Sequence, residues 1–185
     1  MQRVMIIGGS GSGKSTVARR LGNITSLPVI HIDKLFWLPE WVERPKAERD
    51  RLMREAIAAE RWIFDGNYSS TFDERAARAD TIVFLDIATA RRIARVVWRT
   101  AIHFGRSRPD MTEGCPERLN ADYLDFVVNW VAGYNRRGAR AKALALLEGS
   151  PRQATVHHLT SPRDVERFLA GVATSQQKTA PEGAA

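Results

Sequence analysis

Features common in secreted and membrane proteins are missing from this sequence of 185 residues. It has one cysteine, Cys115, so no intramolecular disulfide can form, and this favours a reducing compartment. No apolar run approaches the roughly 20 residues that span a bilayer. The first predicted strand begins just after Met1, which leaves no room for a signal peptide. We therefore expect a soluble, cytoplasmic protein without a membrane partner.

Motifs of several other nucleotide-dependent classes are also missing. No N-K-x-D motif for guanine recognition occurs, and no glutamate follows Asp65 or Asp86, the two acids that end apolar runs. Motor-type ATPases commonly use such a glutamate to activate water, so its absence favours transfer to a bound acceptor over hydrolysis. The net charge of +7 indicates an anionic partner, but no helix-turn-helix, zinc or RNP-type signature accompanies it. Nucleic acid stays possible as a partner, without support from a motif.

What the sequence does contain is a phosphate-binding loop. The segment Gly8-Gly9-Ser10-Gly11-Ser12-Gly13-Lys14-Ser15 matches G-x-x-x-x-G-K-[ST], between an apolar run at 4–7 and a helical pattern that we expect to end at Gly22. Glycine lets successive N–H groups point into one concavity, and Lys14 can reach the β- and γ-phosphates. Ser15 can coordinate Mg²⁺. The residues expected to hold ATP are Gly8, Gly9, Ser10, Gly11, Ser12, Gly13, Lys14, Ser15 and Thr16.

Strand and helix patterns alternate along the chain without repeats. Apolar runs predict strands at 4–7, 29–32, 61–65, 81–86 and 154–159, and helical spacing predicts helices at 16–21, 45–60, 72–79 and after Pro162. Continuous apolar strands separated by helices indicate an α/β fold with a parallel sheet covered on both faces. We expect one domain over residues 1–172 and a disordered tail over residues 173–185.

Three carboxylates are predicted at the carboxyl ends of strands, where such sheets bind ligands. They are Asp33, Asp65 and Asp86, and we expect them to converge near the P-loop. Asp65 is predicted to hold Mg²⁺ with Ser15. Asp33 is predicted to be the general base for an acceptor hydroxyl, with a helix cap or an outer Mg²⁺ ligand as the alternative.

Aromatic residues cluster directly after Asp33. Phe36, Trp37 and Trp41 are predicted to stack on a planar or sugar-like acceptor, or alternatively to form a packing flap.

A charged segment rich in proline and glycine, residues 104–119, is a predicted lid. Arg106, Arg108 and Arg118 are expected to swing over the triphosphate, with Arg106 binding ATP and the other two stabilising the transferring group. Further arginines are predicted to act from below the phosphates or to form a solvated stripe: Arg136, Arg137 and Arg140 in the first role, Arg91, Arg95 and Arg99 in the second.

Three segments outside the P-loop carry a family resemblance. They are HIDKLFW at 31–37, DGNY at 65–68 and RPDMTEGCPERL at 108–119. Over about residues 1–170 the chain resembles the bacterial DNA topology modulation protein family, an adenylate-kinase-like group of P-loop proteins. The resemblance implies a five-stranded parallel sheet of order 2-3-1-4-5, a lid, and an acceptor segment that includes Asn67. Adenylate kinases carry Asp-Gly-Phe-Pro-Arg where this chain has DGNY, which argues against a nucleoside monophosphate as acceptor.

These observations predict a Mg²⁺-ATP-dependent phosphotransferase. The acceptor is expected to be a small molecule with a hydroxyl group, such as a nucleoside or nucleotide-like compound. Two alternatives stay open: a nucleic-acid-associated ATPase that affects DNA topology, and a nucleotide-binding regulator without turnover.

Overall fold

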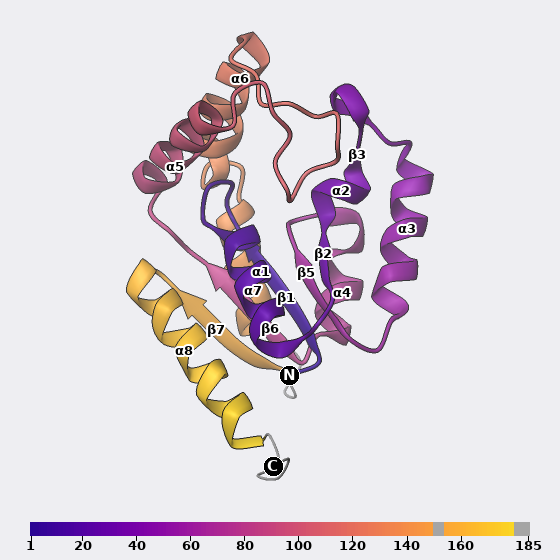
Figure 1. Cartoon of the computed structure of the whole chain (residues 1–185), viewed down its shortest axis with the longest axis vertical. Coiled ribbons are helices and arrows are strands. Elements are labelled where there is room, and N and C mark those ends of the chain that lie inside the picture. Colours follow the sequence, from indigo (N-terminus) through magenta and orange to yellow (C-terminus); the bar gives the residue numbers. More distant parts are fainter. Residues whose placement is uncertain (150–153, 180–185) are drawn as a thin grey trace, which may run out of the picture.

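A five-stranded parallel sheet forms the centre of the computed structural model, which describes residues 1–149 and 154–179 (Figure 1). Its strands are β1 (Arg3–Gly8), β2 (Val29–His31), β5 (Trp62–Asp65), β6 (Thr81–Leu85) and β7 (Thr155–Leu159). They lie in the order β2-β5-β1-β6-β7, and every pair is parallel. Numbered within this sheet alone, the order is 2-3-1-4-5. The predicted α/β fold and strand order are confirmed.

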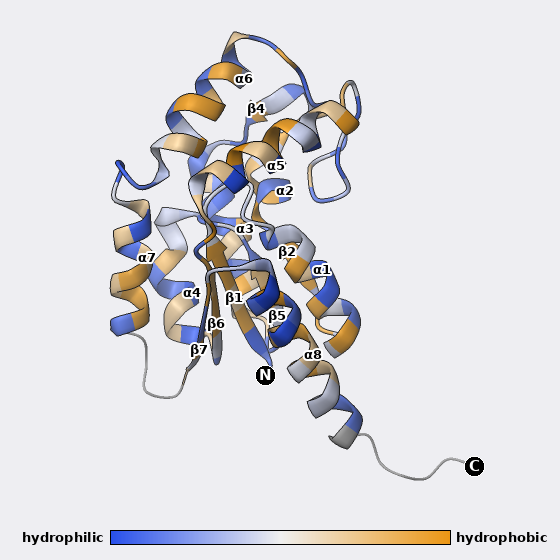
Figure 2. Ribbon diagram, turned by 90° about the vertical axis from the view of Figure 1, so that its left-hand side faces the viewer, coloured by the Kyte–Doolittle hydropathy of each residue, from blue (hydrophilic) through white to orange (hydrophobic). Residues whose placement is uncertain are grey.

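Side-chain alternation along the strands places helices on both faces of the sheet. Val4 and Ile6 of β1 join one buried cluster with residues of α1 and α8, whereas Met5 and Ile7 join the other with residues of α3, α4 and α7. Figure 2 shows the hydrophobic colour along the central strands. The covering helices are α1 (Lys14–Thr25), α3 (Lys46–Ala58), α4 (Phe72–Arg78), α7 (Ala139–Glu148) and α8 (Pro162–Thr179).

Two further groups of elements stand at the carboxyl end of the sheet (Figure 1). One contains α5 (Thr89–Ile102), the predicted lid, and α6 (Ala121–Asp125), which continues as a π-helix (Phe126–Val131) and a 3-10 turn (Ala132–Tyr134). The other, which the sequence analysis did not foresee, contains α2 (Ile32–Phe36) and an antiparallel hairpin. The hairpin consists of β3 (Trp37–Leu38), a 3-10 turn (Pro39–Trp41) and β4 (Val42–Glu43); a last 3-10 turn (Ser69–Thr71) precedes α4.

The prediction that the first helix ends at Gly22 is wrong. Helix α1 continues to Thr25, and Ser26 ends it in a left-handed conformation with φ of 55°. Gly22 serves close packing instead, because a Cβ there would lie 2.6 Å from a methyl carbon of Val29 on β2.

Two other boundaries differ from the sequence prediction. Strand β2 ends at His31, so Asp33 lies in the first turn of α2 and not at a strand end. Helix α8 continues to Thr179, so the tail predicted from residue 173 begins too early, and residues 180–185 lie outside the described chain. None of the helices in residues 1–149 and 154–179 combines the length and apolarity that crossing a bilayer requires.

Candidate active site

The P-loop connects β1 to α1 in a conformation that glycine makes possible. Gly8, Gly11 and Gly13 have φ of 148°, 79° and 102°, which L side chains rarely adopt. Space is also limiting, since a Cβ on Gly11 would lie 2.3 Å from the carbonyl oxygen of Arg92. Lys14 is the first residue of α1, and its Nζ lies 3.4 Å from the carbonyl oxygen of Gly9. The loop therefore surrounds the helix N-terminus, where partial positive charge favours an anion.

Asn67, in the turn after β5, forms two hydrogen bonds with the backbone of the P-loop. Its Nδ2 donates to the carbonyl oxygen of Gly8 at 2.5 Å, and its Oδ1 accepts from the Gly8 N–H at 3.2 Å. The predicted acceptor residue is therefore engaged with the P-loop backbone. Arg75, fully buried on α4, supports the same turn by donating to the carbonyl oxygens of Gly66 and Tyr68.

Asp65 ends β5 as a buried carboxylate beside Lys14. Its Oδ2 lies 2.7 Å from His31 Nδ1, whereas its Oδ1 has no hydrogen-bond partner among the described residues. Burial lowers the pKa of Lys14, although attraction from Asp65 and then Asp33 opposes this effect. A lysine in this environment gains from an anionic ligand, which would favour its charged form.

Asp33 lies at the open side of the same cluster. Its side chain is exposed, yet the protein around its other sides desolvates it and raises its pKa, and the nearby Asp65 carboxylate adds to the rise. Lys14 and Arg108 act in the opposite direction. The cluster thus contains two carboxylates in different environments, one buried and one accessible to a bound molecule.

The donor set suits a magnesium ion and not an all-protein metal cage. Ser15 and Asp65 offer hard oxygen atoms, and the free Oδ1 of Asp65 lacks a partner that a metal or its water would supply. Within the described residues, no three His, Cys, Asp or Glu side chains are arranged to hold a metal ion. Mg²⁺ needs no such group, since it typically uses one or two protein ligands together with nucleotide phosphates and water.

A buried ionic cluster fixes the base of the predicted lid. Arg108, only 7% exposed, forms ion pairs with Asp110 at 3.0 Å and with Glu117 at 2.6 Å. Glu117 accepts a hydrogen bond from Thr100 on α5 at 2.8 Å. Burial opposes ionisation of Asp110, but Arg108 and hydrogen bonds, including one from Ser15, outweigh it and lower its pKa. These contacts restrain the Arg108 side chain within its own segment, since Asp110 and Glu117 also lie in residues 104–119. The predicted swing of this segment over the triphosphate stays a prediction.

The predicted lid is also docked on the hairpin that follows α2. Trp41 Nε1 donates to the carbonyl oxygen of Pro116 at 2.9 Å, Thr112 Oγ1 to that of Trp37 at 2.7 Å, and Cys115 Sγ to that of Leu38 at 3.2 Å. Segments some 75 residues apart in sequence thus form one wall beside the active site.

The aromatic residues pack chiefly on one another in this wall. The rings of Trp37 lie 4.8 Å from Phe36 and 5.5 Å from Trp41, edge to face, and the Arg49 guanidinium covers Phe36 at 4.1 Å. This arrangement favours the packing flap over an open stacking platform.

A cavity of about 460 Å³ lies along the edge of the lid. It is lined by Lys34, Ser107, Arg108, Pro109, Met111, Thr112 and Glu113, and by none of the three predicted aromatic residues. Arg106 and Arg118 are exposed, and neither side chain has a hydrogen bond or ion pair within the described residues. Of the predicted lid arginines, only these two are free to move.

Asp86 does not join the acidic cluster, so the predicted convergence of three carboxylates is wrong. It is paired with Arg140 through contacts of 2.7–3.1 Å and lies 3.1 Å from His158 Nε2. Burial opposes ionisation of Asp86, but these partners outweigh it and lower its pKa. The predicted phosphate role of Arg140 is thereby replaced, and Arg137 instead donates to backbone carbonyls and covers the Trp130 ring.

Helix α5 contributes arginines that the sequence analysis misjudged. Arg95 donates to the carbonyl oxygen of Ser12 in the P-loop at 3.0 Å, and Arg99 lies 3.8 Å from Glu117. Of the three arginines predicted to form a solvated stripe, Arg91 alone is exposed without such a contact in the described chain. Arg92, which no motif marks, is 2% exposed and donates to the carbonyls of Ile87 and Val131. A helical spacing of four residues signals one shared face but not what that face contacts.

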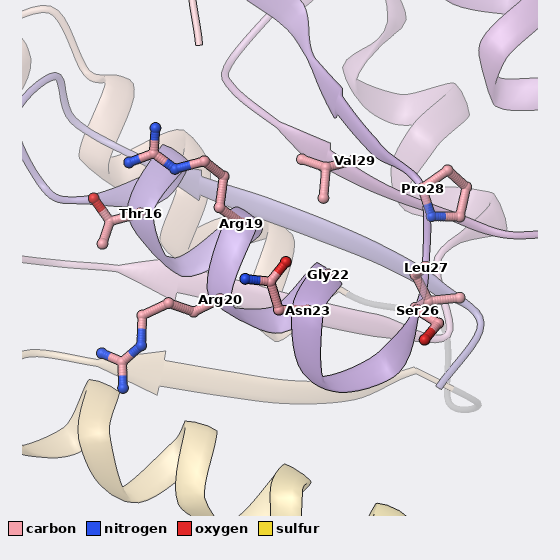
Figure 3. Close-up of a pocket in the computed structure, with 9 residues that line it drawn as sticks. All are labelled: Thr16, Arg19, Arg20, Gly22, Asn23, Ser26, Leu27, Pro28 and Val29. Carbon is pink, nitrogen blue, oxygen red and sulfur yellow. The ribbon is translucent and has the colours of Figure 1, made fainter. Parts of the chain in front are cut away.

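A second hollow lies along the outer side of α1 (Figure 3). It measures about 650 Å³, is lined by Thr16, Arg19, Arg20, Gly22, Asn23, Ser26, Leu27, Pro28 and Val29, and includes none of the clustered acids. Arg20 extends from it toward α8, where it pairs with Glu166. The P-loop and the clustered acids lie instead at the carboxyl end of the sheet, where parallel sheets of this kind bind ligands.

Solved structures similar to this chain include kinases named for small molecules. Shikimate kinase from Bacteroides thetaiotaomicron is 15% identical, covering 95% of this chain and 98% of that one, with a TM-score of 0.51. Shikimate kinase from Acinetobacter baumannii in complex with shikimate is 10% identical, covering 98% and 96%, with a TM-score of 0.56. A sugar kinase from Janibacter sp. HTCC2649 is 18% identical, covering 95% and 98%, with a TM-score of 0.50.

No protein-family model matches this chain, and neither does any curated protein sequence. At these identities the structural similarity establishes the fold alone. The resemblance to the DNA topology modulation family stays a prediction.

Proposed function

We propose that this protein transfers the γ-phosphoryl group of Mg²⁺-ATP to a hydroxyl group of a small molecule. The observation that carries the proposal is the cluster of Lys14, Asp65 and Asp33 at the mouth of a glycine-rich phosphate cradle. One carboxylate is buried with a free oxygen, and the other is accessible with a raised pKa. This division suits one acid for the metal and one for the acceptor.

The P-loop would bind ATP. The backbone N–H groups of residues 8–16 surround the phosphates, and Lys14 neutralises charge on the β- and γ-oxygens. Ser15 and Asp65 would hold Mg²⁺, which would offset the negative charge of the phosphate groups. Ser15 would then exchange its hydrogen bond with Asp110 for the metal. Arg106 would approach the triphosphate from the lid.

Asp33 would act on the acceptor. It accepts the proton of the acceptor hydroxyl while that oxygen forms its bond to the γ-phosphorus and the bond to the β-phosphate oxygen breaks, releasing ADP. Its raised pKa increases its affinity for that proton. Arg108 keeps a fixed positive charge beside the reaction, and Arg118 would approach as negative charge redistributes.

The acceptor would lie between Asp33 and the wall formed by the lid and hairpin. Phe36, Trp37 and Trp41 shape that wall, while the cavity edged by Lys34, Ser107 and Thr112 offers polar contacts. A polyhydroxy compound such as a sugar or shikimate fits this lining, and it agrees with what the neighbours are named for.

The test is ADP release measured against a panel of nucleosides, nucleotides, sugars and shikimate, with product mass determined for any compound that stimulates it. A product heavier by one phosphoryl group supports the proposal. Turnover stimulated by DNA instead of a small molecule would point to the nucleic-acid-associated ATPase and effects on DNA topology. ATP binding without transfer to any compound would point to a regulator.

A further inference from the structure

The exposed large apolar side chains gather in one part of the molecule. Within the described residues, apart from Met1 and Val42, all such side chains lie on α5, the lid or the α6 segment. Figure 2 shows several hydrophobic residues along the ribbons of α5 and α6. The exposed apolar side chains in this part are Val97, Trp98, Ile102, Phe104, Leu119, Leu124, Val128 and Trp130. Soluble monomers seldom expose so many large apolar groups together, and such patches mark interaction sites.

Local geometry brings together the segments that carry six of these side chains. Trp98 and Ile102 are separated by four residues on α5, as are Leu124 and Val128 on α6 and the following π-helix. The Gly105 N–H donates to the carbonyl oxygen of Glu117 at 3.0 Å, which brings the segments of Phe104 and Leu119 together. Helix α5 also contacts the π-helix. We call this surface the α5–α6 band: Trp98, Ile102, Phe104, Leu119, Leu124 and Val128.

Unpaired charges of both signs border the band. Arg106 and Arg118 follow or precede its lid residues and have no side-chain partner in the described chain. Within the described residues, the side chains of Asp122 and Asp125 on α6 accept hydrogen bonds only from the neutral side chains of Asn120 and Asn129. A surface with its own unpaired cations and anions around an apolar centre is complementary to itself under a two-fold rotation.

Other partners fit this border less well. The two arginines and two aspartates together leave the border without the excess of positive charge that attracts anionic lipid headgroups or nucleic acid phosphates, and nucleic acid would leave the apolar centre without a matching surface. The six apolar side chains, each offering on the order of 100 Å², approach with their charged rim the roughly 800 Å² per partner of a standard interface.

We propose that the α5–α6 band is the interface of a symmetric dimer of this chain. In that dimer the band of one copy packs against the band of the other, with the charged residues of each copy at its rim. The proposal concerns assembly and does not depend on the reaction proposed above.

The first test is sedimentation velocity between roughly 1 and 100 µM, a range that brackets ordinary dimer affinities. We expect a dimer for the unaltered chain and a monomer for Trp98→Glu and for Leu124→Glu. The matched control is Val42→Glu, an exposed valine outside the band, which should remain dimeric. A monomer at all concentrations, or a dimer that survives both band variants, would overturn the proposal.

A second measurement covers the case in which a band variant does not fold, as judged by circular dichroism. Leu124→Cys and Val42→Cys are each labelled with a nitroxide, since Cys115 is buried and does not compete for the label. We expect strong dipolar coupling between copies at position 124 and weaker coupling at position 42. Equal or absent coupling contradicts the dimer, as does binding of the monomer to vesicles of anionic lipid through the band.

Discussion

The sheet and the region from α5 to the π-helix differ in which kinds of side chain they bury. In the sheet, the apolar side chains of β1, β5 and β6 are buried, and the Asp65 carboxylate stands at the end of β5. In the α5 region Arg92, Arg108 and Glu117 are buried, while Trp98 and Leu124 face outward. Apolar burial is nondirectional and stabilises a scaffold broadly, whereas buried ion pairs require particular geometry. We infer that the sheet sets where ATP binds, and that the α5 region sets how the site is completed.

The largest effect is expected from Asp33→Asn, which removes the proton acceptor but keeps its shape. Phosphoryl transfer should fall by about a thousandfold or more, whereas ATP affinity should remain within about threefold. Coupled ADP release and calorimetry with a non-hydrolysable ATP analogue measure the two quantities. Loss of ATP affinity together with turnover would mean that Asp33 serves the nucleotide.

Lys14→Ala tests the sheet side of the comparison directly. ATP affinity or turnover should fall by about two orders of magnitude or more, because the β- and γ-phosphates lose their main cation. Arg19→Ala is the matched control, since Arg19 is an exposed cation on the same helix. Calorimetry that finds the two variants equal would show that the P-loop does not bind the triphosphate as proposed.

Arg118→Ala tests whether the free lid arginine acts during transfer. We expect kcat to fall by roughly a hundredfold with little change in Tm, because the exposed side chain has no partner within the described part of its own chain. Arg106→Ala should affect ATP binding more than kcat. If Arg118→Ala lowers Tm but leaves kcat unchanged, Arg118 is a structural residue.

Glu117→Gln tests how much the buried ionic cluster of the α5 region contributes to stability. It leaves Arg108 and Arg99 facing a neutral side chain, so the free energy of unfolding should fall by about 3 kcal/mol and Tm by roughly 6–12 °C. Glu113→Gln, an exposed change in the same lid, should shift Tm by about 1 °C or less. Calorimetric melting of both variants decides the matter. Equal Tm values would show that the cluster contributes no stability.

The smallest effect concerns pH. The pKa of Asp33 is higher in the folded chain than in the unfolded chain, so the folded state binds this proton more tightly and stability is lost as pH rises through the folded pKa. Asp33→Asn should therefore raise Tm slightly at neutral pH and not below the ordinary pKa of an aspartate. Melting curves at several pH values measure the difference, and a constant difference would contradict the assigned pKa shift.

The sequence predicts the scaffold well because its signals are local. Five apolar runs mark the five strands, and one glycine-rich motif marks the phosphate cradle, each readable within about ten residues. Gly22 shows the limit: glycine after an apolar helical pattern suggests an end, but here it permits contact with Val29.

The α5 region could not be predicted in the same way, because distant contacts determine it. Trp41 donates a hydrogen bond to Pro116, which is 75 residues away in sequence, and Arg95 donates one to Ser12, which is 83 residues away. Arg92 and Arg95 are three residues apart on one helix, yet one is buried and the other exposed. Residue type gives no signal of this difference, and neither does spacing. Only the packing of α5 against the P-loop and the π-helix decides it.

The double hydrogen bond between Asn67 and Gly8 has a consequence for the affinity of the loop. A flexible glycine-rich segment loses much conformational entropy when a ligand orders it, and that loss weakens binding. Here the amide of Asn67 restrains Gly8 from both its N–H and its carbonyl before any nucleotide arrives. A triphosphate would then lose less free energy to ordering the loop, so more of the free energy of its phosphate contacts would contribute to binding.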